Sequence, residues 1–93
     1  MDWTLKFRES AIKDLKKLDK QVAVRIRDYL TKTVIGKHSD NPRAVGEALK
    51  GVRLGAYCKY RIGDFRVIAK IEDAELVILV IKVGNRREVY KKK

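Results

Sequence analysis

Two arginines are predicted to face each other across a β-hairpin, an arrangement that costs stability. Residues Ala56–Ile62 and Phe65–Glu72 alternate apolar and polar side chains, and Gly63-Asp64 between them is a favoured two-residue turn. Such a turn places Arg61 opposite Arg66, and like charges directly across a hairpin destabilise it. The pair therefore indicates either a solvated face with the two side chains splayed apart or a site where an anion binds between them.

The same hairpin is predicted to have one basic face and one apolar face. Side chains alternate between the faces of a strand, so Tyr57 and Lys59 share a face with Arg61 and Arg66. The opposite face is apolar and is expected to carry the helices of the domain. It holds Cys58, Tyr60, Ile62, Phe65, Val67, Ala69 and Ile71.

A basic C-terminal tail is expected to reach the basic face. A third strand is predicted over Glu75–Val83 with a turn at Asp73-Ala74, which brings Arg66 opposite Ile81. The chain then leaves the sheet beside the two arginines. Its tail offers cations and an aromatic ring, which are the groups that clamp phosphates and stack on the bases of single-stranded RNA. These residues are Arg86, with Arg87 as a further cation, and Tyr90.

The charge balance also favours a polyanionic partner. Lys and Arg total 23 against 12 Asp and Glu, which gives a net charge of +11. Neutralising phosphates releases counterions, so this charge suits a nucleic acid. An acidic protein partner and a surface tuned for solubility are the alternatives.

Redox and metal chemistry are not indicated. The single cysteine, Cys58, excludes an internal disulfide and is predicted to be a buried structural thiol. No Cys and His residues have metal-ligand spacing, and His38 lies in a predicted solvated loop. We therefore expect neither a metal nor another cofactor.

The length and hydropathy predict one small cytoplasmic domain over residues 1–93. The longest strongly apolar run, Leu76–Ile81, is too short to span a bilayer. The first residues have no signal-peptide pattern.

The periodicity predicts an α+β fold with the order β-α-α-β-β-β. Trp3–Phe7 alternates like a strand, and two helices follow, the second with Asp19 as its N-cap. A loop is expected over Gly36–Pro42 and a short helical turn over Arg43–Lys50. The expected architecture is an antiparallel sheet with the helical hairpin on one face and the basic tail at the end, and Leu76–Ile81 in the middle of the sheet.

The chain as a whole resembles the RelE/ParE toxin superfamily. The order of elements matches that family, and the resemblance covers essentially the whole sequence. The phrases that carry it are Leu15-Lys16-Lys17-Leu18-Asp19, Asn41-Pro42-Arg43, Leu49-Lys50-Gly51, Tyr60-Arg61-Ile62-Gly63-Asp64-Phe65-Arg66-Val67-Ile68 and Val83-Gly84-Asn85-Arg86-Arg87-Glu88-Val89-Tyr90.

The resemblance to RelE-type members implies a ribosome-dependent mRNA endonuclease. Such a toxin cuts mRNA in the ribosomal A site, without a metal, by attack of a ribose 2′-OH on the adjacent phosphate. By position, the catalytic residues implied are Lys59, Arg61, Arg66, Arg86 and Tyr90. Some members have Lys where this chain has Arg61, and an arginine is too basic to act as a general base. Either Lys59 accepts the proton, or catalysis rests on alignment and charge stabilisation.

The resemblance also implies partners. These are an acidic RelB-like antitoxin, the ribosome with its mRNA, and operator DNA only when the antitoxin is bound. Tyr57, Arg87 and Lys91 are predicted to contact RNA. Three other functions remain open at this point: a ParE-like gyrase inhibitor with the same fold, a non-catalytic nucleic-acid-binding module, and a degenerate toxin that has kept only antitoxin binding.

Overall fold

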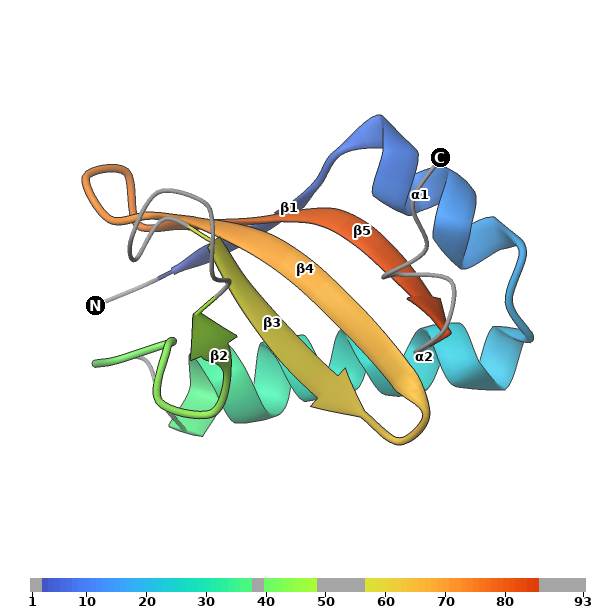
Figure 1. The fold of residues 1–93 in the computed structure, drawn as a ribbon. Helices are drawn as coiled ribbons and strands as arrows, with labels where there is room; N and C mark the ends of the chain where they lie inside the picture. The colour runs from blue at the N-terminus through green and yellow to red at the C-terminus, as the bar shows by residue number, and fades with distance from the viewer. Residues whose placement is uncertain (1–2, 38–39, 49–56, 86–93) are drawn as a thin grey trace.

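A twisted sheet carries the helices of this protein (Figure 1). The structure is a computed structural model, and it describes residues 3–37, 40–48 and 57–85. Among these residues, no helix is long and apolar enough to cross a membrane. The elements are β1 (Thr4–Phe7), α1 (Glu9–Lys16), α2 (Lys20–Asp28), the π-helical segment η1 (Tyr29–Lys37), β2 (Glu47–Ala48), β3 (Tyr57–Ile62), β4 (Phe65–Glu72) and β5 (Val77–Asn85). The predicted α+β class and the order of the main elements are confirmed.

The second helix is longer than its apolar pattern suggested. It begins after Asp19, as predicted, although the Asp19 side chain makes no capping hydrogen bond. It then continues without a break from α2 into η1, which ends at Lys37, so the first residues of the predicted loop are helical. Ile26, Leu30 and Val34 recur every fourth residue along this stretch and are fully buried.

The sheet is mixed, and the prediction of a wholly antiparallel sheet is wrong. The strand order is β1-β5-β4-β3-β2, and β1 runs parallel to β5 with Thr4 beside Val77. Alternating hydrophobicity identifies a strand without giving its direction. The helices and the β3–β4 hairpin supply the long connection that a parallel pair requires.

The helical turn predicted over Arg43–Lys50 is wrong at Glu47 and Ala48, and Leu49 and Lys50 lie outside the described residues. The backbone turns at its start, where the N–H of Ala44 donates to the carbonyl of Asn41 at 2.9 Å. Glu47 and Ala48 then form β2, which pairs with Lys59 and Cys58 of β3. The edge of β3 offers unpaired backbone groups, and these satisfy the short segment better than an isolated helical turn would.

The predicted register of the β3–β4 hairpin is confirmed, since Ile62 pairs with Phe65 and Arg61 with Arg66. The predicted β4–β5 register is wrong. Arg66 pairs with Gly84 and not with Ile81, because Asp73 to Leu76 form a longer turn and a β-bulge follows Ile68. Leu76 in that turn has a left-handed backbone with φ 55°. A leucine rarely adopts this conformation, so the sequence did not predict it.

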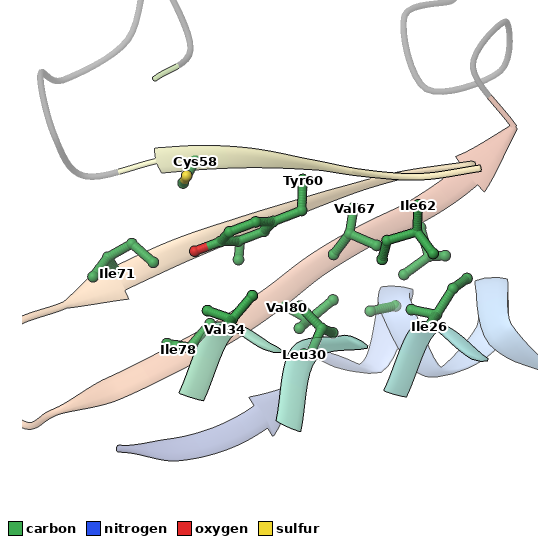
Figure 2. Packing of buried hydrophobic residues seen from close by; sticks show 13 residues of the cluster. Ile26, Leu30, Val34, Cys58, Tyr60, Ile62, Val67, Ile71, Ile78 and Val80 are labelled. Atoms are coloured by element: carbon green, nitrogen blue, oxygen red, sulfur yellow. The ribbon is translucent and has the colours of Figure 1, made fainter. Parts of the chain in front are cut away.

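The core lies between α2–η1 and the apolar face of the sheet. Figure 2 shows Leu30 and Val34 of the helix close to Val80 and Ile78 of β5, with Tyr60 of β3 above them. All the residues predicted for the apolar hairpin face are buried except Phe65, which is partly buried and packs against the core.

Cys58 belongs to this core and is buried, as predicted. Burial raises the pKa of its thiol, because the thiolate would lose its hydration. A protonated, enclosed thiol fits a structural role.

Tyr60 joins the core to the segment that precedes β2. Its ring is fully buried, and its hydroxyl donates a hydrogen bond to the carbonyl of Pro42 at 2.7 Å. We expect Tyr60→Phe to lower the free energy of unfolding by about 1–2 kcal/mol, since it leaves a buried carbonyl without its donor. Urea denaturation measures this, and an unchanged midpoint and slope would show that the bond contributes nothing.

Candidate functional site

A carboxylate lies between the two cations of β3. Lys59 and Arg61 alternate along β3 with the buried Cys58 and Tyr60. The Nζ of Lys59 lies 3.3 Å from Oε1 of Glu47, and Nη2 of Arg61 lies 3.3 Å from Oε2 of the same residue. Glu47 is paired with Lys59 in the β2–β3 register, so the backbone itself brings the three side chains together. We call Glu47, Lys59, Arg61 and the neighbouring Arg66 the basic-face cluster.

The charges of this cluster hold Glu47 ionised. The hydrogen bond from Lys59 lowers the pKa of the Glu47 carboxyl most, and the positive charges of Arg61, Lys59 and Arg66 lower it further. Lys59 is mostly covered, with 16% of its side chain exposed, whereas Arg61 is 60% exposed. An ionised carboxylate is therefore fixed beside one covered and one accessible cation.

Arg66 faces Arg61 in the register but turns its side chain to the hairpin turn. Only 9% of Arg66 is exposed. Its Nη1 donates to the carbonyl oxygens of Gly63 at 3.2 Å and Phe65 at 3.1 Å. The two arginines thus avoid full repulsion, because Arg61 turns to Glu47 while Arg66 turns to two carbonyls. The guanidinium of Arg66 is held in one place beside the turn.

The tail begins next to this cluster. Arg66 pairs with Gly84 and Phe65 with Asn85, which is the last residue described at this end of the chain. The predicted tail residues Arg86, Arg87, Tyr90 and Lys91 lie outside the described residues. Tyr57 is half-buried at the other end of β3, where it pairs with Lys70.

Glu47 was not among the site residues predicted from the sequence. A signal was present, because Glu47 is the single acidic residue between Asp40 and Asp64 in a stretch rich in Lys and Arg. Glu47 reaches Lys59 and Arg61 only because β2 pairs with β3, and this pairing was not predicted because a helical turn was expected there.

Arg43 ties the turn before Glu47 to the distant β4–β5 turn. Its guanidinium donates to both carboxylate oxygens of Asp73, at 3.0 and 2.9 Å. This bidentate bond lowers the pKa of the Asp73 carboxyl. Together with the hydrogen bond from Tyr60 to Pro42, it fixes the path of the chain into β2.

Gly46 lets β2 approach the core closely. A Cβ at this position would clash with Sγ of Cys58 and would lie 2.9 Å from Cε1 of Tyr60. We expect Gly46→Ala to push β2 outward and to lower the free energy of unfolding by about 1–3 kcal/mol. The NMR shifts of Lys59 and Arg61 should change as Glu47 moves away from them.

Gly36→Ala is the matched control for this prediction, because a Cβ there would meet one backbone oxygen at 3.3 Å. The NMR shifts of Lys59 and Arg61 in β3 should not change in Gly36→Ala. Equal effects of the two substitutions would mean that the packing of Gly46 does not position Glu47.

The chemistry available to the cluster is proton transfer and anion binding. Guanidinium and ammonium groups stabilise a phosphate, and an ionised carboxylate can accept a proton. Among residues 3–37, 40–48 and 57–85, no group of three or more His, Cys, Asp or Glu side chains is placed to hold a metal ion.

Known proteins share this sequence and fold. Residues 5–90 match the family described as the ParE toxin of the type II toxin–antitoxin system parDE. A RelE-like toxin protein of Escherichia coli is 34% identical over 97% of this chain and 92% of its own length. The mRNA interferase toxin RelE of E. coli K12 is 29% identical over the same shares.

The fold agrees with these relatives. A crystal structure of the toxin–antitoxin complex RelBE2 from Mycobacterium tuberculosis superposes with a TM-score of 0.74 at 24% identity, over 92% of this chain and 93% of that one. The family match spans nearly the whole chain, including the three cations of the basic-face cluster. This chain therefore belongs to the RelE/ParE superfamily, the toxins of type II toxin–antitoxin systems.

Proposed function

We propose that this toxin is a metal-independent endoribonuclease that cuts mRNA on the ribosome and so stops translation. The observation that carries the proposal is the ionised carboxylate of Glu47 held between Lys59 and Arg61, next to the buried guanidinium of Arg66. The carboxylate can accept the proton of a ribose hydroxyl and the cations can stabilise the phosphate under attack, although the same cations make the carboxylate a weaker base.

Glu47 is the base in this proposal. A guanidinium carries its proton at neutral pH and cannot accept another, which excludes Arg61, and the ammonium of Lys59 already contacts the carboxylate of Glu47. Glu47 is ionised already, so it can take a proton without first losing one. This assignment replaces the two alternatives left open by the sequence, in which Lys59 was the base or no base was needed.

In the proposed reaction, each proton and each bond is accounted for by Glu47, the RNA and a cation of the tail. The proton of a ribose 2′-OH passes to Glu47, and the 2′ oxygen forms a bond to the adjacent phosphorus. The bond from phosphorus to the 5′ oxygen breaks, and the departing alkoxide, a stronger base than a neutral guanidine, takes a proton from a cation of the tail, Arg86 by the resemblance. The products are a 2′,3′-cyclic phosphate and a 5′-hydroxyl. Arg61 and Arg66 stabilise the negative charge that builds up on the phosphoryl oxygens.

Further contacts follow from the resemblance. Tyr90 stacks on a base, and Tyr57, Arg87 and Lys91 contact the RNA strand. An acidic RelB-like antitoxin neutralises the toxin in the cytoplasm, and operator DNA is bound only by the pair. The name of the E. coli mRNA interferase supports mRNA as the target, and the antitoxin in the M. tuberculosis complex supports an antitoxin partner.

The test is cleavage on purified ribosomes programmed with a defined mRNA. The chain should cut the mRNA in the A site, and the single-turnover rate should be unchanged by a chelator of transition metals at constant free Mg²⁺. Expression in cells should stop translation while DNA supercoiling stays normal. Intact mRNA together with altered supercoiling would instead assign the chain to the gyrase-inhibiting toxins.

A further inference from the structure

An open pocket lies at the edge of β3, between this strand and the α2–η1 helix. Its volume is about 440 Å³. The lining residues that carry charge or an aromatic ring are Arg25, Asp28, Tyr29, Lys32 and Arg61. Arg61 also contacts Glu47, so the pocket adjoins the basic-face cluster.

The guanidinium of Arg25 lies beside the hairpin turn. A Cβ at Gly63 would lie 3.3 Å from Nη2 of Arg25, so the missing side chain of this glycine, whose backbone is left-handed with φ 62°, leaves room for the guanidinium. The carbonyl of the same glycine accepts a hydrogen bond from Arg66. The guanidinium groups of Arg25 and Arg66 therefore both adjoin one turn, and within the described part of the chain neither forms an ion pair with a carboxylate.

Lys32 adds an accessible cation on the other side of the pocket. Its side chain is 76% exposed, and its contact with Asp28 on the same helix is long, at 3.9 Å. An exposed pair of this kind is weak. Lys32 is therefore able to bind an anion in the pocket.

Arg61 connects the cluster to the pocket, because it contacts Glu47 and also lines the pocket. In the described residues, β2 pairs with Cys58 and Lys59 and not with Arg61. A strand bound at Glu47 that follows Arg61 therefore leads to the pocket.

We propose that this pocket binds the nucleotide adjacent to the cut phosphate of a single-stranded RNA. Arg25 and Lys32 contact its phosphate, and the half-buried ring of Tyr29 lies under its sugar and base. The position of this nucleotide next to the cleaved phosphate rests on the proposed function, whereas the binding of RNA in the pocket does not.

The experiment measures binding of a fluorescent 2′-O-methyl RNA hexamer to the full chain by anisotropy, between about 50 and about 200 mM salt. This RNA has no free 2′-OH, so it cannot be cleaved and the result does not depend on catalysis. For single strands, each phosphate contact contributes about 0.7 to the slope of log affinity against log salt. Arg25 and Lys32 share one phosphate, so the double variant should reduce the slope by about 0.7, and Arg25→Gln and Lys32→Gln should each reduce it by part of that amount.

Two controls make the result specific. Arg27→Gln removes one charge from the same helix, but Arg27 lines a different groove, with Phe7 and Leu15, so the slope should stay as in the unaltered chain. Asp28→Asn should strengthen binding, because it removes a negative charge from the pocket rim.

Several outcomes would overturn the proposal. Unchanged slopes in Arg25→Gln and Lys32→Gln would do so, as would an equal loss in Arg27→Gln, which would mean that only the overall charge matters. Undetectable binding by the unaltered chain at the lowest salt would do so too. If the chain binds as expected but does not cut mRNA on the ribosome, the proposed function fails and the pocket stands.

Discussion

Glu47→Gln is expected to lower the single-turnover rate of mRNA cleavage by about 10²–10⁴-fold, the usual contribution of a general base. Glutamine keeps the size and the hydrogen-bonding oxygen of the side chain but cannot accept the proton. The contacts with Lys59 and Arg61 therefore weaken without leaving a cavity. Saturating ribosomes separate this chemical effect from any change in binding.

The pH dependence tests the same role with a definite sign. The pKa of the Glu47 carboxyl is lowered, so it stays ionised until the pH falls below the ordinary glutamate range of about 4.3. The cleavage rate should therefore be flat through neutral pH and should fall only in acid. If Lys59 were the base, the rate would instead rise with pH toward the ordinary lysine range of about 10.4.

Glu72→Gln is the matched control, since Glu72 also faces a cation, Lys70, but lies outside the cluster. It should cleave at the normal rate. If Glu47→Gln also cleaves normally, Glu47 only neutralises its neighbours and the proposed base is wrong.

Arg66→Lys is expected to lower the same rate by about 10²–10³-fold, equivalent to about 3–4 kcal/mol of lost transition-state stabilisation. Lysine keeps the positive charge but lacks the planar fork with which arginine binds phosphoryl oxygens. Arg66 is buried beside the turn and already oriented by two carbonyls, so its position is fixed before substrate arrives. The loss should appear in the cleavage step and not in ribosome affinity.

The fold of the variant needs its own measurement, because Arg66 also supports the hairpin turn. A thermal melt should show a folded protein, and antitoxin binding should persist. Lys70→Gln, on the same strand, serves as the control. Cleavage by folded Arg66→Lys at the normal rate would remove Arg66 from the site.

Local signals predicted the part of the site that lies on the hairpin. Gly63-Asp64 defines a two-residue turn, so the facing of Arg61 and Arg66 followed from the sequence and is confirmed. The alternation of β3 likewise separated Lys59 and Arg61 from the buried Cys58 and Tyr60.

Long-range pairings could not be predicted in the same way. The direction of β1 and the pairing of Glu47 with Lys59 depend on contacts between segments far apart in the chain. The β4–β5 register depended on a left-handed Leu76, a conformation that turn rules assign to glycine or asparagine. These are the places where the sequence predictions were wrong or incomplete.

The chemical nature of the ends of the cut mRNA tests the central claim most directly. In-line attack by the 2′-OH, with Glu47 as base, predicts a 2′,3′-cyclic phosphate on the upstream fragment and a 5′-hydroxyl on the downstream fragment. Mass spectrometry of the fragments from programmed ribosomes distinguishes these ends. A 3′-hydroxyl with a 5′-phosphate would show that water attacks the phosphate, and uncut mRNA would show no cleavage; either result would contradict the account.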